Sequence, residues 1–336
     1  MRKWVITAGS TSLEGMRIVE EARPEPGPGE VLIRVRACSL NYRDQAIVTG
    51  NYFGGVLQAD QVPLSDGAGE VEAVGTGVTK FKAGDRVAGL FFQNWHDGCP
   101  GPNVGPALGA PPAKGMLTEY VTLPERGVTR IAKSLSFEEA ATLPCAGVTA
   151  WNALMEGARP TLPGETVLIL GTGGVSLLAL QIAKAAGARV IATSSSDDKL
   201  ARVKALGASN GINYRQVEGW GAEAFRLSGG VDHVVEVGGV GTLAQSMQAV
   251  GFAGEIGLVG VLTREGDTNP HGLMMKGASL RGIFVGNGVM AERLNACIDA
   301  NGIKPVVDRV FAFEDAVEAY RYQSSSALFG KVVIAV

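Results

Sequence analysis

The chain has 336 residues, a length at which two domains are expected. Hydrophobic residues make up 46% of it and charged residues 19%, and this composition excludes a disordered chain. Thirty Lys and Arg residues against 33 Asp and Glu residues give a net charge of −3. Because no basic excess is available to neutralise phosphates, nucleic acid is not expected as a partner.

Neither a secretion signal nor a membrane span is expected. Arg2 and Lys3 precede an apolar run that is shorter than the ~7 to 15 residues of a signal-peptide core. No segment approaches the ~18 consecutive apolar residues of a transmembrane helix. We therefore expect a cytoplasmic protein.

The first part of the chain shows the period-two alternation of half-buried β-strands. A stretch rich in Gly and Pro, centred on residues 98–113, has no such period and predicts a loop. We expect a barrel-like β-domain whose long loop, Trp95 to Lys114, either overhangs a cleft or crosses a subunit boundary. The predicted strands are Glu30–Ala37, Gly69–Val74, Asp85–Ala88 and Leu117–Leu123.

From Ser136, a predicted helix cap, strands and helices alternate, which is typical of βαβ units and a parallel sheet. The predicted strands are Thr166–Leu170, Arg189–Thr193, Gly211–Tyr214, Val231–Val237, Gly254–Gly260 and Ser279–Val285, and the helices are Val175–Ala186, Lys199–Leu206 and Leu243–Val250. A helix at Val289–Ala300 and β-like segments at Arg309–Phe313 and Lys331–Val336 follow. We therefore predict a cofactor domain of residues 123–287 and a substrate domain of residues 1–122 and 288–336.

A glycine cluster follows the apolar strand that ends at Leu170. It reads Gly171-Thr172-Gly173-Gly174-Val175-Ser176, with Ser176 at the third glycine position of the dinucleotide fingerprint. The backbone at such a turn approaches a pyrophosphate, and the helix N-terminus supplies free N–H groups. Strand, turn, helix and following strand together predict dinucleotide binding. The alternative is a tight turn in a ligand-free sheet.

The next strand ends in serines, where a site for NAD would place a carboxylate. The hydroxyls of Ser194 and Ser195 can donate to a 2′-phosphate, and Lys199 and Tyr214 can add charge and a further donor. The sequence therefore predicts NADPH/NADP+ as the cofactor.

Two observations leave alternatives to this choice of cofactor. The serines would also serve to cap the helix that contains Lys199. Asp197 and Asp198 argue against NADPH, since either carboxylate could take the ribose role if the loop were displaced.

The order of these parts resembles the medium-chain dehydrogenase/reductase superfamily over essentially the whole chain. The resemblance implies an α/β protein with a GroES-like β-barrel substrate domain and a Rossmann-type, doubly wound, parallel-sheet cofactor domain. It is strongest to the zinc-free branch that includes quinone oxidoreductases, zeta-crystallin and enoyl reductases. It rests on Asn41-Tyr42-Arg43-Asp44, Asp66-Gly67-Ala68-Gly69-Glu70-Val71, Ala83-Gly84-Asp85-Arg86-Val87, Cys145-Ala146-Gly147-Val148-Thr149, the Gly171 turn and Gly330-Lys331-Val332-Val333.

Zinc is not expected. Zinc enzymes of the superfamily carry Cys where Asn41 stands and Gly-His-Glu where Leu64-Ser65-Asp66 stand, so that only Cys145 matches a ligand. One ligand of three does not hold a catalytic zinc. The four cysteines are too far apart for a structural zinc lobe, and we expect His96, His233 and His271 to be structural.

The pattern and the resemblance together imply a set of cofactor residues, most of them at the carboxyl ends of parallel strands. The resemblance also implies a homodimer that pairs the edge strand Gly254 to Leu262. Ala46 stands where the NADPH-dependent quinone oxidoreductases have a tyrosine. The cofactor set is Thr149, Gly171, Thr172, Gly173, Gly174, Val175, Ser194, Ser195, Lys199, Tyr214, Val237, Gly238, Gly260, Val261, Phe284, Val285 and Lys331.

Without zinc, hydrogen-bond donors must stabilise the charge that develops on a substrate oxygen. Our hypothesis is hydride transfer from NADPH to the β-carbon of an enone, or to a quinone, while Asn41 and Tyr52 polarise the oxygen. A purely structural role is the alternative for each donor. The competing functions are a metal-free alcohol dehydrogenase or ketone reductase and a non-catalytic NADPH-binding protein. The candidate catalytic residues are Asn41, Tyr42, Arg43, Tyr52 and Ser65.

Overall fold

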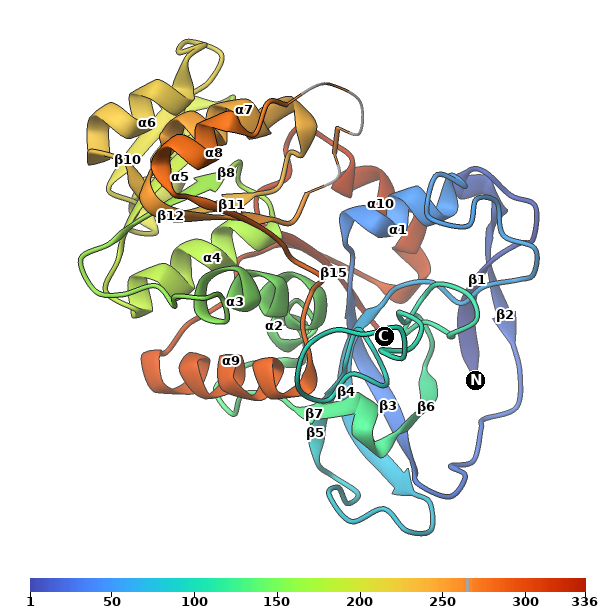
Figure 1. Ribbon diagram of the computed structural model, residues 1–336. Helices are drawn as coiled ribbons and strands as arrows, with labels where there is room; N and C mark the ends of the chain where they lie inside the picture. The colour runs from blue at the N-terminus through green and yellow to red at the C-terminus, as the bar shows by residue number, and fades with distance from the viewer. Residues whose placement is uncertain (261, 264–265, 267) are drawn as a thin grey trace. The chain divides into compact units, whose positions relative to one another are not determined.

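A computed structural model describes residues 1–260, 262–263, 266 and 268–336 (Figure 1). The chain divides into two compact units, which are Met1–Val148 with Gly286–Val336 (unit 1) and Thr149–Val285 (unit 2). Residues 123–148 thus belong to unit 1, although the sequence prediction placed them in the cofactor domain. The reason is strand pairing, because β6 (Tyr120–Pro124) and β7 (Val128–Arg130) pair with strands of unit 1.

Unit 1 is built on a seven-stranded sheet with the order β14-β15-β3-β4-β5-β7, and β6 pairs with β3 beside this path. The last strand pairs antiparallel with β3, so that the tail of the chain completes this sheet. A separate ribbon is formed by β1 (Arg2–Ile6) and β2 (Met16–Glu20). The other strands are β3 (Glu30–Ser39), β4 (Asp66–Val74), β5 (Arg86–Gly89), β14 (Val307–Phe311) and β15 (Lys331–Ala335).

The apolar side chains of β3 form the centre of the core of unit 1. Val31, Ile33 and Val35 are buried, as the period of the sequence predicted, and so is Leu32, which interrupts the alternation with polar positions. Helices close the edges of this core, and Tyr320, on the last of them, is completely buried. The helices are α1 (Tyr42–Val48), α2 (Phe137–Ala140), α9 (Gly288–Asn301) and α10 (Ala316–Gln323), with a π-helical turn, η3, at Leu143–Gly147.

Unit 2 is a six-stranded parallel sheet with the order β10-β9-β8-β11-β12-β13, and helices lie on both of its faces in Figure 1. The strand order reverses between β8 and β11, which is where such sheets bind ligands. The predicted doubly wound α/β fold is confirmed. The strands are β8 (Thr166–Leu170), β9 (Arg189–Ser194), β10 (Asn210–Asn213), β11 (Val231–Glu236), β12 (Val250–Leu258) and β13 (Ser279–Gly282).

The helices of unit 2 include three that the sequence analysis missed, which are α3, α6 and α8, and α6 packs beside α7. No helix in the described part of the chain is both long and apolar enough to span a bilayer. The helices are α3 (Val148–Met155), α4 (Gly174–Ala185), α5 (Asp197–Ala205), α6 (Trp220–Ser228), α7 (Val240–Ala249) and α8 (His271–Lys276).

The edge of the parallel sheet differs from the prediction. Strand β12 is an interior strand, because it pairs with β11 on one side and with β13 on the other. Its burial agrees with this position, since Glu255, Ile256 and Gly257 are all buried residues. The edge on this side of the sheet is β13, and β10 is the edge on the other side. A homodimer that pairs the edge next to β12, which stays a prediction, would use β13.

The predicted loop around Trp95 to Lys114 forms several hydrogen bonds with other segments of unit 1. The N–H of Leu108 donates to the Phe91 carbonyl, and the N–H of Gly288, where α9 begins, donates to the Trp95 carbonyl. Asn287 donates through its side chain to the Gly98 carbonyl. The loop thus holds α9 against the barrel strands of its own unit.

We predict that Gly69→Ala destabilises unit 1. A Cβ at Gly69, on β4, would lie 2.1 Å from the Arg34 carbonyl oxygen on β3, and backbone at the centre of a sheet cannot move aside. We expect a loss of about 3 kcal/mol or more in unfolding free energy, measured by chemical denaturation. Gly101→Ala is the control, because a Cβ there meets nothing within 4 Å. Equal stabilities of the two variants would contradict the packing described here.

Candidate active site

Two of the predicted residues, Lys331 and Asn41, meet where β15 begins. The Lys331 ammonium is buried and donates to the Leu40 carbonyl at 2.5 Å and to Asn41 Oδ1 at 2.6 Å. Antiparallel pairing of β15 with β3 places Lys331 beside the end of β3. Sequence analysis assigned Lys331 to the cofactor set. In the structure it belongs to unit 1 and forms a hydrogen bond with Asn41.

The contact with Lys331 fixes which way the Asn41 amide points. An ammonium group can only donate, so the atom that faces it must be the amide oxygen. The amide nitrogen then faces Ser65, with Nδ2 3.5 Å from Oγ. The Ser65 hydroxyl in turn donates to Asp66 Oδ1 at 2.7 Å, and Asp66 Oδ2 accepts the Cys145 N–H at 3.1 Å. A continuous hydrogen-bonded chain therefore runs through Lys331, Asn41, Ser65 and Asp66.

Two buried carboxylates belong to this cluster. Burial raises the pKa of Asp66, and the charge of Lys331 opposes that rise. Burial also raises the pKa of Asp44 to about 6, against the opposing charge of Arg43 and the N–H of Asn41, which donates to Asp44 Oδ2 at 2.6 Å. The other oxygen of Asp44 has no hydrogen-bond partner among the described residues.

Arg43 and Tyr52 form a second group in unit 1. Arg43 Nε donates to the Tyr52 hydroxyl at 3.3 Å, and Nη1 donates to the Leu108 carbonyl at 2.7 Å. The guanidinium lies over the rings of Tyr52 and Phe91. Because the Tyr52 oxygen accepts from Arg43, its own hydrogen remains for another acceptor. Tyr42 is exposed at the start of α1 and lies outside both groups.

The residues at the zinc position of the superfamily do not fit that metal. Asn41 supplies an amide and Ser65 a hydroxyl, both already bound in the chain from Lys331 to Asp66. Burial raises the pKa of the Cys145 thiol well above its usual value, which disfavours the thiolate that a metal requires. Within the described residues, no three His, Cys, Asp or Glu side chains form a metal-binding group.

The glycine turn of unit 2 fits a dinucleotide. Gly171 has φ +72°, and a Cβ at Gly171 or Gly173 would meet nothing within 4 Å, so space lies open beside this backbone. The turn leads into α4, whose N-terminal N–H groups favour an anion. Ser176 is buried, and its hydroxyl donates to the Leu170 carbonyl at 2.6 Å. This bond explains how a serine replaces the third glycine of the fingerprint.

The residues expected to bind a 2′-phosphate lie at the carboxyl ends of β9 and β10. The N–H of Tyr214 donates to the Ser194 carbonyl, so these two residues are adjacent, and Tyr214 is exposed. Ser196 caps α5, with Oγ accepting the N–H of Lys199, as the alternative interpretation of the serines expected. Ser195 is half-buried beside it.

The carboxylate of Asp197 is occupied by its neighbours. Its two oxygens accept from Asn213 and Gln216, each at 2.8 Å. Asp198, the other carboxylate that argued against NADPH, is exposed beside it. Arg215, which the sequence analysis missed, is exposed directly after Tyr214.

A buried carboxylate organises the third part of the predicted cofactor set. Glu236 Oε1 accepts the N–H groups of Gly238 and Gly239 at 2.7 and 3.0 Å and the Thr242 hydroxyl at 2.6 Å. Sequence analysis missed Glu236, although an acid that ends an apolar strand was a visible signal. Gly260 is required beside this turn, since a Cβ there would lie 1.7 Å from the Val237 carbonyl oxygen.

The remaining predicted cofactor residues are spread over unit 2. Thr149 is buried on α3, and Phe284 is about half exposed. Val285 has φ +49°, a strained value for a β-branched residue, and its carbonyl accepts from the Asn152 side chain at 2.8 Å. Val261 lies outside the described residues.

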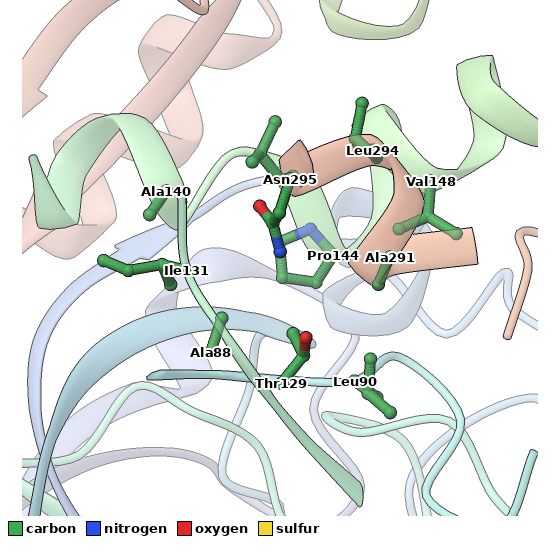
Figure 2. A pocket seen from close by; sticks show the side chains of 11 residues that line it. Ala88, Leu90, Thr129, Ile131, Ala140, Pro144, Val148, Ala291, Leu294 and Asn295 are labelled. Carbon is green, nitrogen blue, oxygen red and sulfur yellow. The ribbon is translucent and has the colours of Figure 1, made fainter. Parts of the chain in front are cut away.

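A separate apolar pocket lies in unit 1 beside α9 (Figure 2). None of the predicted site residues lines it, and Thr129 and Asn295 are its polar members. It is therefore distinct from the candidate site. Its lining is Ala88, Leu90, Thr129, Ile131, Ala140, Leu143, Pro144, Val148, Ala291, Leu294 and Asn295.

Known proteins resemble the chain over nearly its whole length. Residues 27–133 match a family model described as alcohol dehydrogenase GroES-like domain, and residues 174–301 match one described as zinc-binding dehydrogenase. A zinc-type alcohol dehydrogenase-like protein of Schizosaccharomyces pombe is 46% identical over 316 residues, 91% of each chain. The 2-methylene-furan-3-one reductase of Solanum lycopersicum is 34% identical over 318 residues, 93% of this chain and 73% of that one. A crystal structure of an NAD-dependent alcohol dehydrogenase, 34% identical, aligns over both whole chains with a TM-score of 0.89.

We predict that Asp44 makes stability depend on pH. The unfolded carboxyl ionises near pH 4, whereas the folded one keeps its proton until about pH 6. The folded state therefore binds more protons between these values, and the contribution of Asp44 to stability falls as pH rises, by up to about 3 kcal/mol. Relative to Asp44→Asn, the unfolding free energy of the unmodified protein should decrease from pH 4 to pH 7.

The control is Asp198→Asn, which removes an exposed carboxyl. Relative to this variant, the unfolding free energy should show no such decrease. If the difference in unfolding free energy between the unmodified protein and Asp44→Asn stayed constant from pH 4 to pH 7, Asp44 would be ionised over that whole pH range.

Proposed function

The chain belongs to the medium-chain dehydrogenase/reductase superfamily, and from this premise we propose a zinc-independent, NADPH-dependent oxidoreductase that transfers hydride to an α,β-unsaturated carbonyl compound or a quinone. The observation that carries the proposal is the hydrogen-bonded chain from Lys331 to Asp66. It occupies the position of the zinc ligands with groups that donate hydrogen bonds. A donor that polarises an oxygen replaces the Lewis acid of the zinc enzymes.

The proposed reaction needs a donor at the substrate oxygen. NADPH supplies a hydride when it is bound, and addition of the hydride to the β-carbon of an enone leaves negative charge on the carbonyl oxygen. Asn41 Nδ2 and the Tyr52 hydroxyl donate to that oxygen. The α-carbon then takes a proton from solvent, which completes the reduction of the double bond.

Lys331 strengthens the donor at Asn41. Its ammonium binds the amide oxygen at 2.6 Å in a buried setting, and hydrogen bonds in such chains polarise one another. The positive charge thus draws electron density from the amide and makes the Nδ2 hydrogens better donors. Lys331 is a positioning residue in this scheme, because it acts through Asn41.

Three observations support NADPH over NADH. No free carboxylate ends β9, the Asp197 carboxylate is held by Asn213 and Gln216, and the adjacent Ser194 and Tyr214 offer donors. The exposed Arg215 adds positive charge beside them. One similar structure is that of an NAD-dependent alcohol dehydrogenase, so cofactor preference is the first property to measure.

The similar proteins point to two different substrate classes, enones and alcohols. The tomato relative is named as a reductase of 2-methylene-furan-3-one, an enone, whereas other names describe alcohol dehydrogenases. The second candidate is therefore a metal-free alcohol dehydrogenase.

NADPH oxidation with an enone, a quinone and a ketone, together with metal analysis of the same sample, separates the candidates. Turnover of the enone or the quinone without stoichiometric zinc supports the proposal. Bound zinc or activity restricted to the ketone overturns it, and cofactor binding without any turnover identifies a non-catalytic protein.

We predict that Ser195→Asp reverses the cofactor preference. A carboxylate at the end of β9 repels a 2′-phosphate and accepts from a 2′-hydroxyl. Fluorescence titration should show NADPH binding weakened by about 10-fold or more, and NADH binding unchanged or tighter. Ser209→Asp adds the same charge at the opposite end of the parallel strands and should change neither constant. An unmodified protein that prefers NADH would remove the basis of this prediction.

We predict that Asn41→Asp lowers kcat without weakening cofactor binding. The aspartate keeps an oxygen for Lys331 and loses both Nδ2 hydrogens, so that the substrate oxygen loses a donor. Loss of one such donor costs about 100-fold or more in kcat. Asn103→Asp, at an exposed position of the same unit, is the control and should retain full activity. If Asn41→Asp turned over enone at the normal rate, Asn41 would have no part in catalysis.

A further inference from the structure

Val285 has a backbone conformation that valine rarely adopts. Its φ of +49° lies in the left-handed region, where a β-branched side chain crowds the neighbouring backbone. Such a conformation persists only where surrounding groups hold it, and it is found most often at functional sites. The contacts of Val285 therefore show what holds the strain and which site it serves.

Asn152, on α3, binds the carbonyl of Val285. The Asn152 Nδ2 donates to that carbonyl oxygen at 2.8 Å. Asn152 is buried, and a hydrogen bond in such surroundings is electrostatically stronger than one exposed to water. If Val285 left the left-handed region, its carbonyl would turn away from Nδ2, and a buried amide would lose its acceptor.

Arg281, on β13, determines which way the Asn152 amide points. A guanidinium only donates, and its Nη1 lies 2.9 Å from Asn152 Oδ1, so the amide nitrogen must face Val285. Nη2 donates to the backbone carbonyls of Asn152 and Ala153 at 2.7 and 3.3 Å. Nε donates to Oε1 of the buried Glu255 at 2.9 Å, which pairs the charge of Arg281. These bonds connect β12, β13 and α3 in one chain that ends at the Val285 carbonyl.

Val285 follows the same end of the sheet as the glycine turn. β13 ends at Gly282, and the carboxyl ends of parallel strands share one edge of a sheet. A dinucleotide crosses that edge with its pyrophosphate at the turn after the first strand and its adenosine ribose at the end of the second, which are β8 and β9 here. β9 lies on one side of β8, whereas β11, β12 and β13 lie on the other. The nicotinamide half of a bound dinucleotide therefore extends toward the strands that precede Val285.

From this geometry we propose that Asn152, oriented by Arg281, is a positioning residue for the nicotinamide half of the cofactor. It holds Val285 in the left-handed conformation and so fixes the path of the chain that follows β13. Asn152 acts through Val285 in this scheme. The inference rests on the proposed function for the presence of a dinucleotide, and it does not depend on which substrate is reduced.

The test compares NADPH with 2′-phospho-ADP-ribose, which lacks the nicotinamide ring. In Asn152→Ala the Val285 carbonyl loses its donor, and the dissociation constant of NADPH should rise by about 10-fold or more. The dissociation constant of 2′-phospho-ADP-ribose should not change, because the ends of β8 and β9 are left intact. Both constants are measured by calorimetry on the unmodified protein and the variant.

Val285→Gly separates the role of the strain from a general loss of packing. Glycine adopts a positive φ without steric cost, so the contact with Asn152 is less needed in this background. Adding Asn152→Ala to Val285→Gly should therefore weaken NADPH binding by no more than about threefold. If Asn152→Ala alone fails to fold, Arg281→Met, which leaves Asn152 without its orienting donor, gives the same comparison of the two probes.

The control variant is Asn210→Ala. It truncates the same type of side chain at the amino end of β10, and it should change neither dissociation constant. Equal weakening of both probes by Asn152→Ala would overturn the proposal, because unit 2 would then be perturbed as a whole. An equal effect of Asn152→Ala with valine and with glycine at position 285 would also overturn it.

Turnover measured beside binding separates this inference from the proposed function. Selective loss of NADPH affinity in Asn152→Ala, without reduction of enone or quinone by the unmodified protein, supports the positioning role and refutes the proposed reaction. Unchanged NADPH affinity in Asn152→Ala, with turnover by the unmodified protein, supports the reaction and refutes the positioning role. If the unmodified protein prefers NADH, the probes are NADH and ADP-ribose, and the same outcomes decide. An unmodified protein that binds no dinucleotide would refute both.

Discussion

The hydrogen bond from Lys331 to Asn41 is the contact on which the candidate active site depends. It places an ammonium in the interior of unit 1, where an isolated charge would be strongly disfavoured. The nearby carboxylates of Asp66 and Asp44 balance that charge and the charge of Arg43. Because the ammonium only donates, it also sets the orientation of the amide and through it the whole chain to Asp66. One lysine thus determines both the electrostatics and the geometry of this cluster.

Much of the fold followed from the periodicity of the sequence. The apolar run at Thr166–Leu170 and the alternation over Glu30–Ala37 correspond to strands of the structure. A strand buried on both faces is apolar throughout, and a strand buried on one face alternates, so burial can be inferred from side-chain polarity. The edge of the parallel sheet was predicted wrongly. Strand β13 is short and mostly exposed, so its residues carry little information about its neighbours, and pairing is made by backbone groups that all residues share.

For a related reason, the sequence identified some residues of the candidate site and not the contacts between them. Asn41, Ser65 and the glycine turn were identified from motifs that are local in sequence. The contact of Lys331 with Asn41 was not predicted, because nothing in the spacing shows that antiparallel pairing brings these residues together across 290 residues. Residue types at a site are thus readable from a sequence, whereas their partners depend on tertiary pairing.

The separation of Asn41 and Lys331 along the chain also determines when their contact can form during synthesis. Asn41 leaves the ribosome 290 residues before Lys331, which corresponds to roughly 15 to 60 s of translation. The whole of unit 2 is translated within that interval. During this time Asp66 and Asn41 lack the ammonium that they will later share, and the sheet of unit 1 lacks β15. The nascent protein therefore passes through a stage in which unit 2 is fully translated while the sheet of unit 1 still lacks its last strand.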